Sequence, residues 1–390
     1  MQQGRHYGMD WLRIGAFGLL ILYHVGMVFV PWGYHVKTEQ PVPWAVIPML
    51  ATNAWRMALL FGVSGFATAA LLARQDGRVG RFLKGRMPRL LWPLLFGMAV
   101  IVPPQPWVEL TTQRGYTTGY LAFWFGDYFA FEPLHGIMLP TWNHLWFLVY
   151  LLAYTLMLGL LLLLPSAWRE AAGRLAGRAL AGPLIIFVPL ALLYLRIALH
   201  WPLPDETHDF VNDLRAHEAY FGLFLFGFLL ARSDVVWASI RAWWRVAAVL
   251  AVAGYATTIA VGAVWLSTGD PPLWSEVLFE CARDVQGWNA IVALIGLADR
   301  YWNRDHRWRA TLNEAVFPFY VIHQTVIVVV AYWVIGRGVH PAAQFALLVA
   351  ATVAGCWAFY LVGRAIPPLR PLIGLRWKPV PTVRPSVVPA

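Results

Sequence analysis

The first apolar stretch of the chain carries three side chains whose types and spacing suit acid–base chemistry. Asp10 and Arg13 stand near its beginning, and His24 lies eleven residues after Arg13 within an apolar run. At 3.6 residues per turn the three share one face of a helix, with His24 roughly 16 Å beyond Arg13. Because an imidazole exchanges its proton near neutral pH, His24 is a candidate for proton transfer. Helix capping by Asp10 and Arg13, with a structural hydrogen bond of His24, is the alternative interpretation.

A basic cluster of Lys84, Arg86 and Arg89 precedes the third apolar stretch and suits phosphate binding. Arg86 and Arg89 are three residues apart, and Pro88 stiffens the start of the stretch. Two guanidinium forks at helical spacing can bind one phosphate bidentately. The same residues are also explained by the retention of Lys and Arg at the cytoplasmic ends of membrane helices.

The fourth apolar stretch opens with residues that suit carbohydrate binding. Asn143 and His144 offer hydrogen-bonding groups, and an aromatic pair beside them, Trp142 and Trp146, has rings that could stack on a sugar. Tryptophan also collects at the level of the lipid headgroups, so membership of this aromatic belt is the simpler interpretation of the pair.

Three further polar residues lie within apolar stretches. His323 is about midway along the ninth stretch and Glu314 is near its beginning, where structural hydrogen bonds and direct chemistry both explain them. Ser64 precedes Gly65 in the second stretch, and small residues of this kind favour close packing of helices.

The sequence gives little support to metal or redox chemistry. Asp209, Asp213 and His217 recur at four-residue spacing, which is more typical of a solvated acidic face than of a metal site. We therefore predict no metal. Cys281 and Cys356 are too few for a disulfide framework, and their spacing matches no redox or metal motif.

The composition indicates what kind of protein positions these residues. Of 390 residues, 59% are hydrophobic and 13% are charged, against roughly 25% charged in soluble domains, and the mean hydropathy is +0.57. The net charge of +10 would suit nucleic acid or an anionic surface, but its distribution favours a membrane protein. We predict an all-α polytopic membrane protein whose partner is the lipid bilayer and not nucleic acid.

Ten apolar stretches approach the length of about 20 residues that a membrane helix needs. They are residues 11–31, 48–73, 88–104, 144–164, 182–200, 219–231, 246–266, 286–299, 312–335 and 343–366. The sixth and the eighth are the shortest.

The connections between the stretches indicate an orientation. Lys and Arg gather in the connections that lie inside if the N-terminus is cytoplasmic, whereas acidic residues gather in the others. Because Lys and Arg are retained on the cytoplasmic side during insertion, we predict about ten transmembrane helices with both termini cytoplasmic. Residues 1–366 form one transmembrane domain, with the first stretch retained rather than cleaved as a signal peptide. Residues 367–390 form a Pro-rich cytoplasmic tail.

Five segments resemble, in their order, the successive motifs of the membrane-bound acyltransferase 3 family, and within it those of the periplasmic glucan succinyltransferase subgroup. The segments are MDWLRIGAFGLLILYH, WRMALLFGVSGF, FLKGRMPRLLWPLLFG, NHLWFLVYLL and LNEAVFPFYVIHQ. The resemblance implies a ten-helix enzyme of the bacterial inner membrane with no permanently bound cofactor. Such an enzyme transfers an acetyl or succinyl group from cytoplasmic acyl-coenzyme A to a hydroxyl of a periplasmic or cell-envelope glycan.

The resemblance also implies roles for the residues. The essential arginine and histidine of the family match Arg13 and His24, and its Arg-x-x-Arg motif matches the two arginines of the basic cluster. We expect His24 to be the general base, Asp10 and Arg13 to orient and bind the donor, and the basic cluster to hold the phosphates of coenzyme A. We expect Asn143, His144 and the aromatic pair to bind the acceptor.

Two points leave alternatives open. His323 stands alone in VIHQ, where the subgroup tends to have two histidines, and these residues are compatible both with direct transfer and with a covalent acyl-histidine relay.

A transporter or channel with Asp10, Arg13 and His24 along its path is the alternative function. A sugar-sensing or flippase-like partner without catalysis is a third. The basic cluster discriminates the enzyme from the transporter, since a transporter has no need of a coenzyme A site. The third alternative would keep the outer Trp and His residues and leave His24 dispensable.

Overall fold

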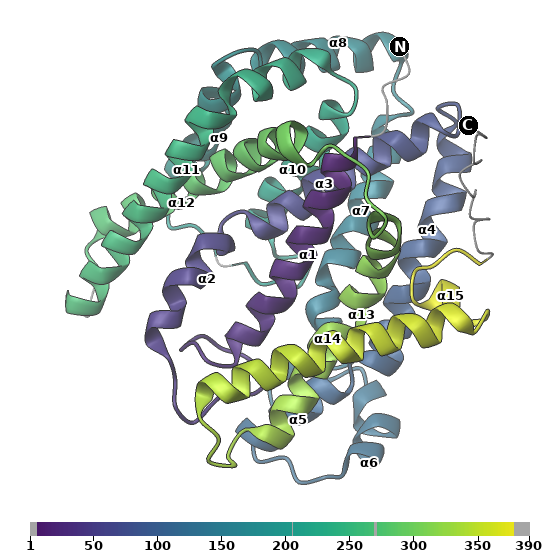
Figure 1. Cartoon of the computed structure of the whole chain (residues 1–390), viewed down its shortest axis with the longest axis vertical. Coiled ribbons are helices and arrows are strands. Elements are labelled where there is room, and N and C mark those ends of the chain that lie inside the picture. The colour runs from purple at the N-terminus through teal and green to yellow at the C-terminus, as the bar shows by residue number, and fades with distance from the viewer. Residues whose placement is uncertain (1–5, 205, 269–270, 378–390) are drawn as a thin grey trace, which may run out of the picture.

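The computed structural model describes residues 6–204, 206–268 and 271–377, and it is built almost entirely of helices (Figure 1). The α-helices are α1 Tyr7–Met27, α2 Val46–Asn53, α3 Arg56–Ala73, α4 Val79–Phe96, α5 Pro104–Gln113, α6 Tyr120–Phe125, α7 Trp146–Leu161, α8 Ser166–Ala179, α9 Leu184–His200, α10 Leu214–Leu230, α11 Asp234–Thr268, α12 Leu273–Leu297, α13 Arg309–Val334, α14 Pro341–Ala365 and α15 Leu369–Leu372. Short 3-10 turns are η1 Pro43–Ala45, η3 Asp127–Phe129 and η4 Asn143–Leu145, and π-helical segments are η2 Gly97–Ile101 and η5 Ala298–Trp302. One antiparallel pair of strands joins β1 Pro133–Leu134 to β2 Ile137–Met138.

Each of the ten predicted apolar stretches falls on a helix. The second stretch, 48–73, is divided by a break between α2 and α3, and the third, 88–104, continues from α4 through η2. Among the residues that the structure describes, six helices are long and apolar enough to cross a membrane, or seven if the bent pair α8–α9 is one span. The chain is thus a multi-pass membrane protein, while the count of ten crossings stays a prediction.

Three of the predicted stretches fall on helices outside that set of six or seven. They lie in α1, α10 and α12. The sequence of α1 includes Asp10 and Arg13, α10 has only 17 residues, and the first half of α12 includes Glu276, Glu280 and Asp284. Charged residues in α1 and α12 and the short length of α10 thus keep these three helices outside the set.

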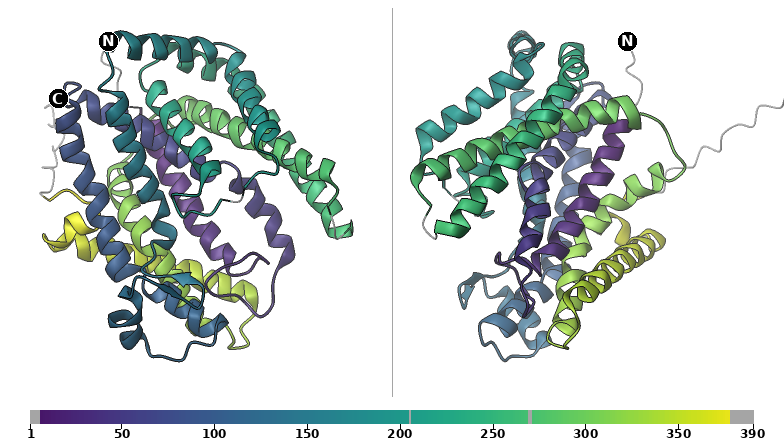
Figure 2. Two further views of the ribbon diagram at one scale, coloured as in Figure 1. Left: turned by 180° about the vertical axis from the view of Figure 1, so that it is seen from behind. Right: turned by 60° about the vertical axis from the view of Figure 1, so that its left-hand side comes forward.

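The helix α1 lies in the middle of the bundle and packs against α3 and α13 (Figures 1 and 2). The helices α3 and α10 also approach closely, because a Cβ atom at Gly65 would overlap the carbonyl oxygen of Phe224 and one at Gly227 would overlap that of Gly62. The backbone oxygen of Ser64 accepts a hydrogen bond from the Thr68 hydroxyl. This part of α3 therefore packs closely against its neighbour, as small residues permit.

The predicted tail begins with a folded segment. Residues 369–372 form α15, which packs against α4 and α14. The Arg370 side chain is buried, and its Nη2 atom lies 3.6 Å from Oε1 of Glu314. Residues 378–390 of the predicted tail lie outside the described residues.

Candidate active site

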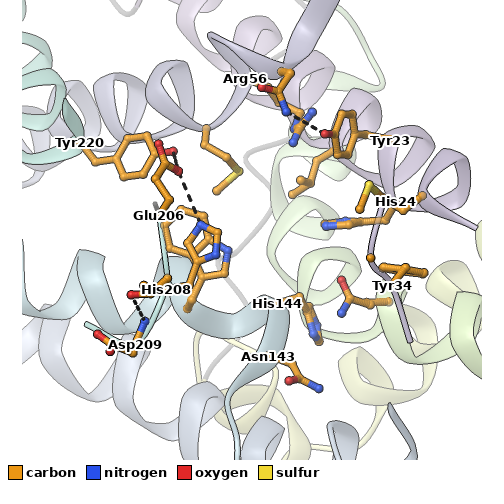
Figure 3. A pocket seen from close by; sticks show the side chains of 18 of the residues that line it. Tyr23, His24, Tyr34, Arg56, Asn143, His144, Glu206, His208, Asp209 and Tyr220 are labelled. Atoms are coloured by element: carbon orange, nitrogen blue, oxygen red, sulfur yellow. Dashed lines mark hydrogen bonds and ion pairs between the residues drawn. The ribbon is translucent and has the colours of Figure 1, made fainter. Parts of the chain in front are cut away.

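A large cavity lies between α1, α3, α10 and α12 and the loops beside them (Figure 3). Its volume is about 1140 Å³, above the roughly 300–1,000 Å³ that is typical of small-molecule sites. His24, Asn143, His144 and both members of the aromatic pair line it. The structure therefore brings the predicted base and the predicted acceptor-binding residues to one cavity.

A chain of hydrogen bonds determines which nitrogen of His24 carries the proton. Nδ1 of His323 lies 2.8 Å from the Tyr320 carbonyl oxygen, which can only accept, so this nitrogen bears the hydrogen. Nε2 of His323 is then an acceptor, and it lies 2.9 Å from Nδ1 of His24, which donates. In this neutral tautomer the unprotonated atom of His24 is Nε2. A base needs such a lone pair.

His144 has a different environment from that of His24. Its Nε2 atom donates to the carbonyl oxygen of Val321 at 3.0 Å, and its Nδ1 atom accepts from Nε2 of Gln105 at 3.2 Å. Both ring nitrogens are therefore engaged in bonds that link η4 to α5 and α13. The histidine is 5% exposed, so it holds the cavity wall together at a place where a sugar was expected to bind.

Gln105 is the centre of this wall and was not singled out from the sequence. It is fully buried, its amide nitrogen donates to the Thr325 hydroxyl at 2.8 Å, and its amide oxygen accepts from Asn143 at 3.2 Å and from Gln324 at 3.0 Å. The segment before it explains its position. Pro103 and Pro104 lack N–H groups, and the preceding π-helical segment η2 is a local widening of the kind found near functional sites.

The aromatic pair is covered by a loop that connects α9 to α10. The His208 ring stacks on the Trp146 ring with centroids 4.2 Å apart, and the His208 carbonyl oxygen accepts from Nε1 of Trp142 at 2.9 Å. The loop is held by the buried Asp213, which accepts from the Tyr150 hydroxyl at 2.5 Å. One ring face that could stack on a sugar is therefore taken by His208.

The acidic run at 209–217 has structural partners. Asp209 accepts hydrogen bonds from Asn212, and His217 bonds to the Tyr154 hydroxyl at 3.0 Å and the Phe210 carbonyl at 2.6 Å. Within the described part of the chain, no group of three or more His, Cys, Asp or Glu side chains is arranged to hold a metal ion.

The side chains of Asp10 and Arg13 on α1 both bind to α13. Arg13 donates through Nη2 to the carbonyl oxygen of Asn313 at 2.9 Å and to its side-chain oxygen. Asp10 accepts from Nη1 of Arg309 at 2.8 Å. Neither residue lines the cavity that contains His24. The polar face predicted for α1 thus divides between two environments.

The basic cluster lies near Arg13. The Arg86 guanidinium is within electrostatic range of Arg13 and Arg89, and Arg89 is in range of Arg376. Arg86 donates to the Thr155 hydroxyl at 3.3 Å, while Lys84 and Arg89 are exposed. Several cations thus gather in one region, an arrangement suited to a polyanion. None of the three residues of the cluster lines the cavity.

Three aromatic rings close the cavity toward Arg13. We call Phe17, Phe147 and Tyr320 the aromatic floor. Phe17 lies between Arg13 and His24 on α1, and its ring centroid is 6.3 Å from that of Phe147 and 5.6 Å from that of Tyr320. Each of the three side chains is less than 8% exposed. The cations and His24 therefore lie on opposite sides of a packed layer.

Glu314, predicted as a supporting residue, joins three helices. It accepts from the Tyr360 hydroxyl at 3.1 Å and lies 3.9 Å from Nε of Arg364 and 3.6 Å from Nη2 of Arg370. These contacts link α13 to α14 and α15, away from the residues that line the cavity.

The comparisons with known proteins agree with this architecture. A family model described as an acyltransferase domain, of the acyltransferase 3 type, matches residues 6–361. The chain is 25% identical over 198 residues to each of two proteins named glucans biosynthesis protein C, one from Salmonella gallinarum and one from Salmonella agona. These alignments cover 50% of this chain and 48% of the relative, so the chain spans about half the length of the curated relatives it matches. No solved structure matches significantly.

Proposed function

Because the chain belongs to the acyltransferase 3 family, we propose that it is a membrane O-acyltransferase that moves an acetyl or succinyl group from acyl-coenzyme A to a hydroxyl of a cell-envelope glycan. Relatives named for glucan biosynthesis support the glycan. The size of the cavity also supports it, since a volume of about 1140 Å³ accommodates several sugar rings.

The observation that carries the proposal is the free Nε2 lone pair of His24. This atom takes the proton from the acceptor hydroxyl, and the oxygen attacks the thioester carbonyl carbon. The tetrahedral intermediate then collapses, the carbon–sulfur bond breaks, and the coenzyme A thiolate takes the proton from His24. His323 keeps Nδ1–H of His24 hydrogen-bonded throughout, because its own Nδ1–H is held by the Tyr320 carbonyl oxygen.

The coenzyme A phosphates are proposed to bind on the other side of the aromatic floor from His24. We propose that the floor opens for the thioester to reach His24. Arg13 and the basic cluster supply the cations for the coenzyme A phosphates. Acyl-coenzyme A is made in the cytoplasm, so the cations are proposed to face that side. We propose a bacterial inner-membrane protein with ten crossings and both termini in the cytoplasm. Asn143 and the open surface of the aromatic pair are proposed to contact the acceptor, with His144 shaping the wall behind them.

The test uses the purified full chain with acetyl- or succinyl-coenzyme A and glucan oligosaccharides. Release of free thiol and the mass of the glycan are followed together. We expect acyl transfer by the natural protein and a loss of about 10²- to 10⁴-fold in His24→Ala. His200→Ala, at an exposed histidine of α9 away from the cavity, is the matched control. Absence of both thiol release and coenzyme A binding in the natural protein would contradict the proposal and favour a transporter.

A further inference from the structure

A buried arginine, Arg56, lies on the wall of the cavity that contains His24 (Figure 3). It is the first residue of α3 and is 5% exposed. Its guanidinium carbon lies 3.5 Å from the centroid of the Tyr23 ring, and the guanidinium also contacts the Tyr23 hydroxyl. The arginine therefore reaches α1 one residue away from the proposed base.

The charge of Arg56 is not balanced by a carboxylate within the part of the chain that the structure describes. Its Nε and Nη1 atoms are buried and have no hydrogen-bond partner there. Two other arginines of the cavity differ, because Arg196 lies 3.2 Å from Asp284 and Arg215 lies 2.6 Å from Glu280. A buried cation with unused donors is costly to a protein that has no anion to place beside it.

The position of Arg56 also matters for His24. Arg56 lines the same cavity as His24, and it stacks on Tyr23, the residue that precedes His24 on α1. The positive charge of its guanidinium attracts a negative charge that forms beside it. Arg56 is thus suited to a site where negative charge forms next to the base.

We propose that Arg56 donates hydrogen bonds to the negatively charged oxygen that forms on the acyl carbonyl during transfer. The inference rests on the proposed function. When the acceptor oxygen bonds to the carbonyl carbon, the carbonyl π electrons move to its oxygen, and His24 holds the proton of the acceptor hydroxyl. The guanidinium stabilises this oxyanion until the electron pair returns, the carbon–sulfur bond breaks, and the thiolate leaves with the proton from His24.

A negatively charged oxygen could also come from the free carboxylate of a succinyl group. The two sources act at different stages of the reaction. The succinyl carboxylate is already present in the bound substrate, whereas the oxyanion forms only in the transition state. An interaction made only in the transition state lowers kcat, whereas loss of an interaction with bound substrate raises KM. Acetyl-coenzyme A carries no such carboxylate, so comparing the two donors separates the sources.

The experiment measures kcat and KM of Arg56→Gln and Arg56→Lys with each donor that the natural protein uses. We expect kcat of Arg56→Gln to fall about 10²- to 10³-fold with acetyl and succinyl donors alike, with KM changed less than about three-fold. Arg56→Lys keeps the charge but loses the fork of donors, and we expect an intermediate loss. Arg245→Gln, which removes an exposed arginine stacked on Trp244 in α11, is the matched control.

The outcomes are distinguishable. An inactive natural protein contradicts the proposed function itself. An active natural protein whose Arg56→Gln variant keeps kcat within about three-fold overturns the role of Arg56, and so does a loss confined to KM for the succinyl donor. Should Arg56→Gln fail to fold, as judged by thermal unfolding, a folded Arg56→Lys protein with unchanged kcat overturns the role equally.

Discussion

The Nδ1 atom of His24 on α1 lies 2.9 Å from the Nε2 atom of His323 on α13. A carbonyl oxygen one turn earlier on α13 orients the second ring, so that the first ring presents an unprotonated nitrogen to the cavity. Two histidines that are 299 residues apart in the sequence thus form one unit. A single chain of hydrogen bonds defines the state of the proposed base.

His323 is expected to act through His24. Replacing it by Leu removes the acceptor of the Nδ1–H bond, so the other tautomer of His24 becomes accessible and kcat falls, by less than the 10²- to 10⁴-fold expected for loss of the base. His323→Gln keeps an oxygen acceptor and should retain more activity. Initial-rate kinetics with saturating substrates measure both. Equal kcat in His323→Leu and the natural protein would contradict the orienting role.

The basic cluster is expected to contribute to donor affinity. Arg86→Gln and Arg89→Gln each remove a guanidinium from a region that already contains Arg13, so KM for acyl-coenzyme A should rise, with a weaker dependence on salt. Arg81→Gln removes an exposed arginine of the same helix and controls for loss of surface charge. A KM for acyl-coenzyme A that stays at the natural value in both cluster variants would place the phosphates elsewhere.

The contact between α3 and α10 should be sensitive to single methyl groups. Gly227→Ala adds a Cβ that overlaps the carbonyl oxygen of Gly62, whereas Gly222→Ala on the same helix meets nothing within 4 Å. We expect the first variant to lower the midpoint of thermal unfolding by several degrees. The second should leave it unchanged or raise it, because alanine is the better helix former. Similar midpoints in the two variants would show that α3 and α10 can move apart without lowering the thermal stability of the protein.

Glu206 should make the stability of the folded protein depend on pH. Burial tends to raise the pKa of this loop carboxyl, but hydrogen bonds and charge from His208, Tyr220 and Arg215 outweigh burial and lower it. Its contribution is therefore present above the ordinary value of 4.5 and is lost as the pH falls through the lowered pKa.

The measurement is thermal unfolding in detergent between pH 7 and pH 3. Glu206→Gln should lose less stability over this range than the natural protein. Glu170→Gln, at an exposed pair on α8, should follow the natural protein. A pH profile of Glu206→Gln identical to that of the natural protein would exclude the contribution.

Much of the helical framework could be predicted from the sequence, because a membrane helix must be apolar over most of its length. The ten stretches fall on helices for this reason. The break between α2 and α3 and the folded segment α15 were not predicted, since both depend on packing against other helices. Pro367, Pro368 and Pro371 are typical of unstructured ends, so the sequence predicts a tail where α15 forms.

The candidate site was predictable only in part. Polar residues in apolar stretches indicated His24, Asn143 and His144, but no sequence pattern shows that both nitrogens of His144 are engaged. Gln105 carries no such signal, because a glutamine between prolines is typical of a loop. Arg56 could have been recognised from the sequence. It lies in the predicted stretch 48–73, nearer to the end that faces away from the cytoplasm, where the positive-inside rule disfavours arginine.

The aromatic floor has a consequence for the cell that contains this protein. A cavity of about 1140 Å³ that opened on both faces of a bilayer would conduct protons and small ions and discharge the membrane voltage. The rings of Phe17, Phe147 and Tyr320 fill the region between Arg13 and His24. While they are packed together, the same three side chains thus oppose ion leakage between the cavity and the side of Arg13.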